Sequence, residues 1–71
     1  MILYKVTRRI IILDNKIHIG YGIKCKKYRF DNISCDREKI VKLCTLCNEL
    51  DLAEIHLGNV VEDFLYDFEV N

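Results

Sequence analysis

The pair Asp14-Asn15 constrains the fold most, because it separates two isoleucine-rich segments, and residue types alternate in the segment that follows it. A two-residue loop of this kind tolerates the positive φ angles that a type I′ turn requires. We therefore predict a hairpin closed at this loop, with successive side chains on opposite faces. The resulting strand pairs place mostly apolar side chains on one face: Ile12–Ile17, Ile10–Ile19, Arg8–Tyr21, Val6–Ile23 and Tyr4–Cys25.

The other face of this hairpin is basic. It gathers the residues that we predict as a candidate partner-binding face: Lys5, Arg9, Lys16, His18, Lys24 and Lys26. Gly20 and Gly22 lie on the same face, and glycines in a strand mark a bulge, a bend or a surface that another backbone approaches. On the apolar face, we expect Arg8 to pack its stem and to hold its guanidinium over Tyr21 or against a helix carboxylate.

The alternation changes phase after Cys25, because Tyr28 and Phe30 are offset from the apolar series before them. A bulge near residues 26–27 within one long strand explains this change, and so does a turn into a third strand over residues 28–33. We favour the long bent strand, since the segment lacks good turn residues.

Two amphipathic helices are predicted to follow. Ser34 or Asp36 caps the first helix, which runs to about Leu50. The second begins between Ala53 and Leu57, and its early glycine either allows close packing or marks the helix start. The side chains expected to face inward are Ile40, Leu43, Cys44, Cys47, Leu50, Leu57, Val60, Val61, Phe64, Leu65 and Phe68, and those expected outside are Glu62, Asp63 and Glu69.

These elements predict an α+β fold: an N-terminal antiparallel hairpin of two or three strands packed on two C-terminal helices. We expect a single small domain over residues 1–71, with the sheet in 1–33 and the helical pair in 34–70. No apolar run approaches the roughly 20 residues of a membrane span. The first residues also lack the basic and apolar regions of a signal peptide. We therefore expect a cytoplasmic protein without a membrane partner.

The charges of this chain sum to zero but are unevenly distributed. Asp14 is the only acidic residue up to Phe30, and no lysine or arginine occurs from Leu43 onward. Such asymmetry can steer a partner or self-association. Mutual neutralisation of the two halves within one domain is the simpler alternative.

The cysteines invite a metal hypothesis. Cys44-x-x-Cys47 has the spacing of half a zinc site, which could be completed by Cys25, Cys35, His18 or His56. The helical pattern, however, places both sulfurs of the pair on the buried stripe, where a free cysteine behaves as a small hydrophobe. We therefore interpret Cys44 and Cys47 as core residues rather than metal ligands or a redox pair, and we predict no cofactor.

No catalytic pattern is present, since the only serine, Ser34, has no histidine and carboxylate in a recognisable arrangement and the role of His56 is open. The basic face could contact nucleic-acid phosphates, but it lacks aromatic residues on which bases stack. We therefore predict a non-enzymatic protein-interaction or regulatory module, with a homodimer among the expected assemblies. Exposed sheet edges favour strand addition. A small nucleic-acid-binding regulator is the alternative.

Part of the chain resembles a family of short proteins of unknown function from clostridia and related Firmicutes. The resemblance covers Tyr21 to Leu65 and rests on Tyr21-Gly22-Ile23, Ile33-Ser34-x-Asp36-Arg37-Glu38-Lys39-Ile40, Leu46-Cys47-Asn48-Glu49-Leu50 and Ile55-His56-Leu57-x-x-Val60-Val61-Glu62-Asp63-Phe64-Leu65. Members tend to have a proline before the second helix, where this chain has Ala53-Glu54. The resemblance implies a bacterial cytoplasmic protein, and it brings no activity, substrate or cofactor.

Overall fold

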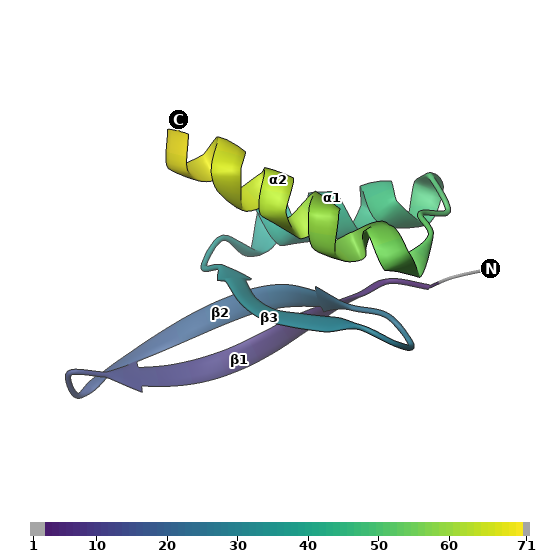
Figure 1. Ribbon diagram of the computed structural model, residues 1–71. Helices are drawn as coiled ribbons and strands as arrows, with labels where there is room; N and C mark the ends of the chain where they lie inside the picture. Colours follow the sequence, from purple (N-terminus) through teal and green to yellow (C-terminus); the bar gives the residue numbers. More distant parts are fainter. Residues whose placement is uncertain (1–2, 71) are drawn as a thin grey trace.

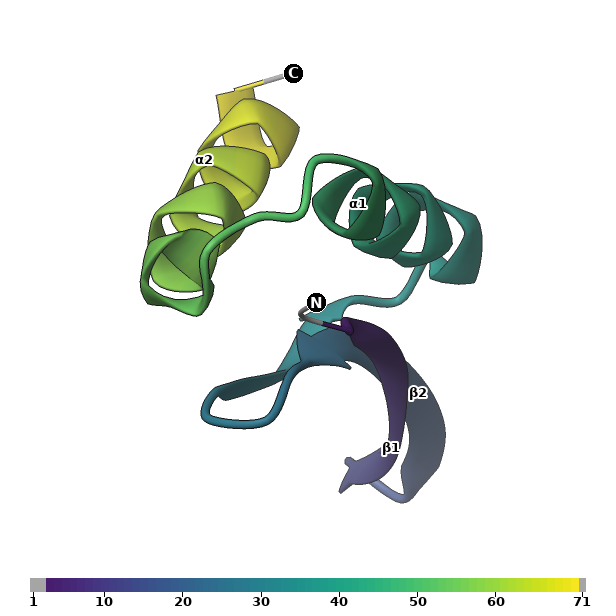
Figure 2. The ribbon, with the colours of Figure 1, turned by 90° about the vertical axis from the view of Figure 1, so that its right-hand side faces the viewer.

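The computed structural model describes residues 3–70, and the side chains of residues 3–66. The elements along the chain are β1 (Lys5–Leu13), β2 (Lys16–Lys24), β3 (Arg29–Ser34), α1 (Arg37–Glu49), the 3-10 helix η1 (Glu54–His56) and α2 (Leu57–Val70). The strands form one antiparallel sheet in the order β1-β2-β3, and both helices lie on one side of it (Figures 1 and 2). The predicted α+β fold is confirmed.

The predicted hairpin register is confirmed along both strands. β1 pairs with β2 from Lys5–Lys24 to Leu13–Lys16 without a shift. Asp14 and Asn15 adopt φ angles of 51° and 63°, as a type I′ turn requires. The loop therefore fixes which residues share a face.

The segment after β2 turns into a third strand, so the favoured long bent strand is wrong. The Cys25 backbone N–H donates to the Tyr28 carbonyl at 2.9 Å, which closes the turn. The Lys27 backbone N–H donates to the Glu54 carboxylate of η1 at 3.0 Å. A distant carboxylate thus stabilises a turn whose own residues are poor turn formers.

β3 bulges where it passes the two glycines of β2. The pairing register of β2 with β3 shifts beside Gly22, and Asn32 of β3 has a φ of 55°. A Cβ on Gly22 would lie 1.9 Å from the Phe30 carbonyl oxygen, and one on Gly20 would lie 2.1 Å from the Asn32 side-chain oxygen. Two of the predicted roles of these glycines are therefore observed: a bulge in the pairing of β2 with β3, and the close approach of another backbone, that of β3.

The N-terminus of α1 uses both predicted capping residues. The Asp36 carboxylate accepts a hydrogen bond from the Glu38 backbone N–H at 3.0 Å, and Ser34 Oγ accepts one from the Asp36 backbone N–H at 3.1 Å. Asp36 is therefore the N-cap, and Ser34 fixes the residue that caps.

The core lies between the proximal part of the sheet and the two helices. Its buried hydrophobic residues are Tyr4, Ile23, Ile40, Cys44, Cys47, Leu57 and Val61. Val6, Tyr21, Leu43, Val60 and Phe64 pack around them and are half-buried. The predicted helix stripes are thus largely confirmed, whereas the side chains of Phe68 and Glu69 lie outside the described residues.

Two residues predicted to face inward are exposed. Leu50 is 66% exposed because it is the C-cap of α1, after which the chain turns at Asp51 with a φ of 49°. Leu65 is 37% exposed and belongs to the C-terminal half of α2, and the C-terminal end of α2 rises away from the sheet (Figure 1). Both residues continue the helical period but lie beyond the surface that packs on the sheet.

The helices are too short to cover the hairpin. A nine-residue strand is about 30 Å long, whereas the 13 and 14 residues of α1 and α2 span about 20 Å each. The hairpin end with the β1–β2 turn therefore projects beyond the helices (Figure 1). The molecule is elongated, with principal extents of 41 × 27 × 19 Å.

Candidate functional site

The end of the hairpin nearest the helices is firmly held. Here, the proximal hairpin means residues 4–7 and 20–25. The Asn48 side chain of α1 accepts a hydrogen bond from the Tyr4 backbone N–H at 2.7 Å and donates one to the Tyr4 carbonyl at 3.0 Å. The Tyr4 hydroxyl donates to the Leu52 carbonyl, and burial raises the pKa of this tyrosine. Asn48 thus occupies the edge of the sheet as a neighbouring strand would.

The other end of the hairpin is uncovered. The distal hairpin means residues 8–19, which include the β1–β2 turn. Four of its aliphatic side chains are more than half exposed: Ile10 at 59%, Ile12 at 70%, Leu13 at 59% and Ile17 at 72%. β3 pairs only with the Tyr21–Lys24 part of β2, so the distal hairpin is a two-stranded ribbon. The prediction that the whole apolar face packs on the helices is therefore wrong for this half.

The ribbon also leaves backbone groups unpaired at the β1 edge. In a hairpin with a two-residue loop, Leu13 and Lys16 exchange backbone hydrogen bonds, and the bonded pairs recur at every second residue. The N–H and C=O groups of Arg8, Ile10 and Ile12 consequently point away from β2. The described residues supply no hydrogen bond to these groups from outside the sheet. Exposed apolar side chains and an open strand edge thus coincide.

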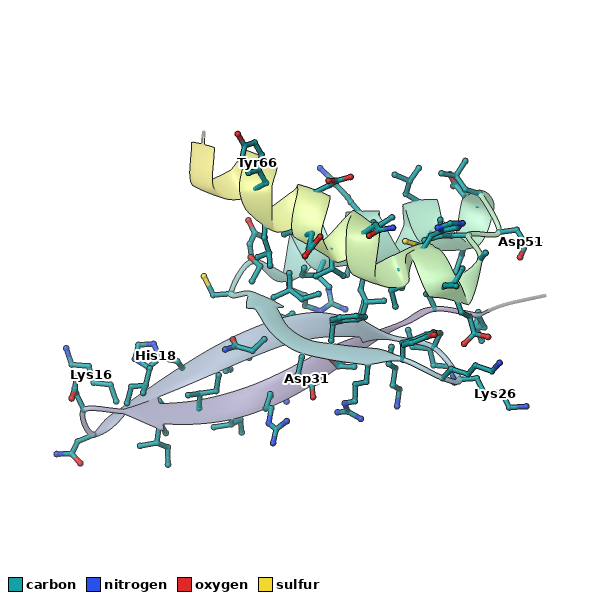
Figure 3. The ribbon with its side chains drawn as sticks, in the orientation of Figure 1. Lys16, His18, Lys26, Asp31, Asp51 and Tyr66 are labelled. Carbon is teal, nitrogen blue, oxygen red and sulfur yellow. The ribbon has the colours of Figure 1, made fainter. Side chains whose placement is uncertain are left out.

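The predicted basic face is split into two ends. Lys16 and His18 lie at the β1–β2 turn and Lys26 lies at the opposite end, with Asp31 of β3 between them (Figure 3). Arg9 lies in the middle, where its guanidinium pairs with the Asp31 carboxylate at 3.1 Å. The sheet therefore does not bring the six candidate residues into one continuous cationic surface.

Asp31 neutralises the middle of this face. Arg29 donates to the same carboxylate at 2.9 Å. The hydrogen bond from Arg29 above all, with smaller contributions from Thr7 and Arg9, holds the pKa of Asp31 below its usual value of 3.8. Asp31 is therefore ionised at neutral pH and offsets the charge of the arginines beside it.

The remaining basic residues gather at the proximal end. Lys5, Lys24 and Lys26 surround a shallow hollow of about 210 Å³, together with Leu3 and Cys25. Lysines around an open hollow can attract phosphate groups electrostatically. This cluster is the part of the predicted face that could act as a unit.

The two cysteines of the Cys44-x-x-Cys47 pair are core residues, as predicted. Both are buried, and burial raises the pKa of each thiol. Cys25 is half-buried and Cys35 exposed, and all four cysteines are free. Among the described residues, no three histidine, cysteine or carboxylate side chains gather as a metal site would require. His56 ends η1 and is exposed.

A second apolar feature lies on the helices. Leu43 and Leu46 of α1 and Phe64 of α2 line an open groove of about 280 Å³, with Lys39 and Lys42 beside them. Leu46 is 49% exposed. The groove is shallow, and its exposed leucine is less accessible than the distal isoleucines.

Sequence reasoning placed the distal isoleucines on the correct face but missed their exposure. One signal was available, because a strand gains about 3.4 Å per residue and a helix only 1.5 Å. Strands of nine residues are longer than helices of 13 and 14 residues, so one end of the hairpin is left uncovered. The length comparison, rather than the alternation, identifies this surface.

Comparisons with known proteins give a family and little else. A protein family described as "Family of unknown function (DUF6514)" matches residues 2–67. No curated protein and no solved structure matches this chain. No helix among the described residues is both long and apolar enough to span a membrane.

Proposed function

The chain belongs to the DUF6514 family of unknown function, and from this premise we propose that it is a non-enzymatic protein-interaction module. In this proposal the distal hairpin docks against a second copy of the chain, so that the protein acts as a homodimer. The histidines are far from any catalytic arrangement, since His18 lies in the distal hairpin and His56 ends η1. Nothing in these positions supports acid–base chemistry.

One observation carries the proposal. Ile10, Ile12 and Ile17 are exposed on the same face of a ribbon that projects from the molecule. Burying apolar surface contributes about 25 cal/mol per Å², so covering this face is favourable. An exposed apolar strand next to an open edge is a site for docking or aggregation unless a partner covers it.

Charge supports a second copy as the partner. The chain has 11 basic and 11 acidic residues, so two copies carry no net repulsion. The distal hairpin contains both signs, with Asp14 against Arg8 and Lys16, while Arg9 is paired with Asp31 of its own copy. A surface with both signs can complement itself across a two-fold axis, where each patch meets its own copy.

A bacterial, cytoplasmic setting forms part of the proposal. The four free cysteines support it, because thiols persist in a reducing compartment. The sequence resemblance to clostridial proteins supports the bacterial part.

The proposal predicts a monomer–dimer equilibrium that depends on the distal isoleucines. Sedimentation or light scattering over a concentration series should show a dimer, and Ile12→Asn or Ile17→Asn should weaken it at least about tenfold, as loss of a central apolar contact does. Ile55→Asn is the matched control, because Ile55 is 73% exposed but lies in η1. A monomer at the highest concentration, or equal weakening by Ile55→Asn, contradicts the proposal.

Nucleic-acid binding is the second candidate, favoured by the lysines around the proximal hollow. A short single-stranded oligonucleotide should then bind at low salt and dissociate steeply as salt rises. Lys24→Glu with Lys26→Glu should abolish this binding, whereas Lys16→Glu at the other end should change it little. Absence of binding at low salt rules this candidate out.

A further inference from the structure

We propose that two copies pair through β1, antiparallel, with the two-fold axis at Ile11. This inference rests on the proposed function and specifies how the dimer forms. The assembly would be a continuous six-stranded sheet in which the β1 strands are central. Two properties of β1 support this pairing: the unpaired backbone groups along its edge and the positions of the charged residues along that edge.

The proximal end of the β1 edge is already occupied. Asn48 bonds both backbone groups of Tyr4 that point away from β2, at 2.7 and 3.0 Å. A partner strand therefore cannot pair at Tyr4 without displacing Asn48. Pairing is left to the distal part of β1.

From Ile10 to Leu13, beyond the charged pair Arg8-Arg9, β1 carries none of the features that protect strand edges. The chain has no proline, and the β1–β2 register has no bulge. Ile10 and Ile12 are exposed, and lysine occurs in β1 only at its first residue, Lys5. Natural edge strands usually carry prolines, bulges or inward charges that prevent pairing. Their absence from residues 10–13 of β1 marks this part of the edge as one that accepts a strand.

Backbone geometry limits the registers that two β1 strands can adopt. Only even-numbered residues of β1 present N–H and C=O groups to the free edge, because the odd-numbered ones bond to β2. An even residue must therefore pair with an even residue, which places the two-fold axis on a residue and never between two residues. Arg8, Arg9, Ile10 and Ile11 are the axis positions that keep several residues paired.

The charges select among these axis positions. An axis at Arg8 or Arg9 places that arginine opposite its own copy, and like charges directly opposite each other are destabilising. An axis at Ile10 places Arg8 opposite Ile12, which leaves the guanidinium without a partner. Each of these three registers leaves an arginine without a partner or places two like charges opposite each other.

The axis at Ile11 gives Arg8 a partner of opposite charge, while Arg9 lies opposite Leu13 and keeps its ion pair with Asp31 of its own copy. Arg8 then lies opposite Asp14 of the other copy, and Ile10 lies opposite its Ile12, each pair occurring twice by symmetry. Both Arg8 and Asp14 are exposed and therefore available. Opposite charges and apolar pairs across strands each stabilise by about 0.2–1 kcal/mol. Pairing also places the isoleucine faces of the two copies side by side, so that Ile10 of each copy packs against Ile12 of the other.

A cysteine on the axis tests the register directly. Ile11 would face its own copy as a non-hydrogen-bonded pair, with the Cα atoms about 4.5 Å apart, which a disulfide can span. Ile11→Cys, in a background in which Cys25 and Cys35 are changed to Ser, should form a covalent dimer with oxidised glutathione. Leu13→Cys in the same background is the control. In this register position 13 of one copy lies opposite position 9 of the other, so the two introduced cysteines are four residues apart along the strands and too far apart for a disulfide.

A charge pair gives an independent test. Arg8→Glu opposes two carboxylates twice per dimer and should weaken the dimer about tenfold. Asp14→Asn alone should also weaken the dimer, and asparagine suits this position of the turn. The double variant Arg8→Glu with Asp14→Asn, however, should form a stronger dimer than Arg8→Glu alone. This reversal of sign occurs only if Arg8 and Asp14 face each other across the interface.

The outcomes separate the two proposals. A dimer that Ile12→Asn weakens, but in which Ile11→Cys does not cross-link and Asp14→Asn shows no reversal, overturns this register and leaves the proposed homodimer intact. A chain that stays monomeric with unmodified β1 overturns both. Cross-linking as efficient at Leu13→Cys as at Ile11→Cys also overturns the register, because it reports random collision.

Discussion

The proximal and distal halves of the hairpin share one strand register but have different surroundings. In both, the strands pair in the predicted register and place mostly apolar side chains on the same face. Ile23 in the proximal half is fully buried, whereas Ile17 in the distal half is 72% exposed. Alternation therefore determines which residues share a face, but the length of the covering helices determines whether that face is buried.

The two halves also differ at the sheet edge. In the proximal half, Asn48 bonds the backbone of Tyr4, and β3 lies against Gly20 and Gly22. In the distal half neither a side chain nor a strand covers the β1 edge within the described residues. We therefore expect the proximal half to provide stability and the distal half to provide binding.

The largest expected difference comes from truncating one isoleucine in each half. Ile23→Ala removes fully buried methyl groups and should lower the free energy of unfolding by about 2–5 kcal/mol. Ile12→Ala should lower it by less than about 1 kcal/mol, because Ile12 is 70% exposed. Urea unfolding at a concentration where the protein is monomeric measures both. Equal losses would show that the distal hairpin is packed in solution.

A second comparison adds one methyl group to a glycine. Gly22→Ala places a Cβ 1.9 Å from the Phe30 carbonyl oxygen, so β3 must move and stability should fall by about 1–3 kcal/mol. Gly58→Ala is the control, because its Cβ would lie 3.6 Å from Phe30, an ordinary contact, and alanine is a better helix former by up to about 1 kcal/mol. Thermal unfolding should show shifts of opposite sign. A neutral Gly22→Ala would mean that β3 is not held against β2.

The edge contact of Asn48 gives the next effect. Asn48→Ala leaves two backbone groups of Tyr4 without their partner and should cost about 1–3 kcal/mol. Glu49→Ala, at an exposed neighbouring position, should cost much less. Hydrogen exchange of the Tyr4 amide checks the mechanism, since it should speed up in the Asn48 variant alone. Unchanged exchange would show that water replaces Asn48 at no cost.

The smallest expected effect is the pH dependence of the turn between β2 and β3. Hydrogen bonds from the Cys25 thiol and the Lys27 backbone N–H lower the pKa of Glu54 below its usual 4.5. Because this pKa is lower in the folded state, the carboxylate stabilises the fold above pH 4.5 and this contribution is lost as the pH falls through the folded pKa. Glu54→Gln should therefore reduce the loss of stability between pH 6 and pH 3, whereas Glu62→Gln on α2 should not. If stability depended on pH identically in the two variants, the Glu54 carboxylate would not stabilise the turn between β2 and β3.

Much of the fold could be predicted from local sequence. The Asp14-Asn15 turn fixed the hairpin register, the Asp36 cap fixed the start of α1, and helical spacing placed Cys44 and Cys47 in the core. Each of these depends on residues close in the chain. The β2–β3 turn could not be predicted in this way, because the carboxylate that holds it belongs to Glu54.

The candidate site was only partly predictable. The basic residues were assigned to the correct face, but Asp31 of a strand that the favoured prediction lacked divides that face and neutralises Arg9. The exposure of Ile12 and Ile17 depends on how far the helices reach along the sheet. The neutralisation of Arg9 and the exposure of the two isoleucines both depend on residues that are distant in the chain.

The sequence by itself determined the hairpin, its register and the residues on each face, because turn geometry and the two-residue period of a strand are local. Only the tertiary structure decided which half of that hairpin is core and which is surface. Burial depends on the relative lengths and positions of elements that are distant in the chain, and these leave Ile10, Ile12 and Ile17 at an open edge.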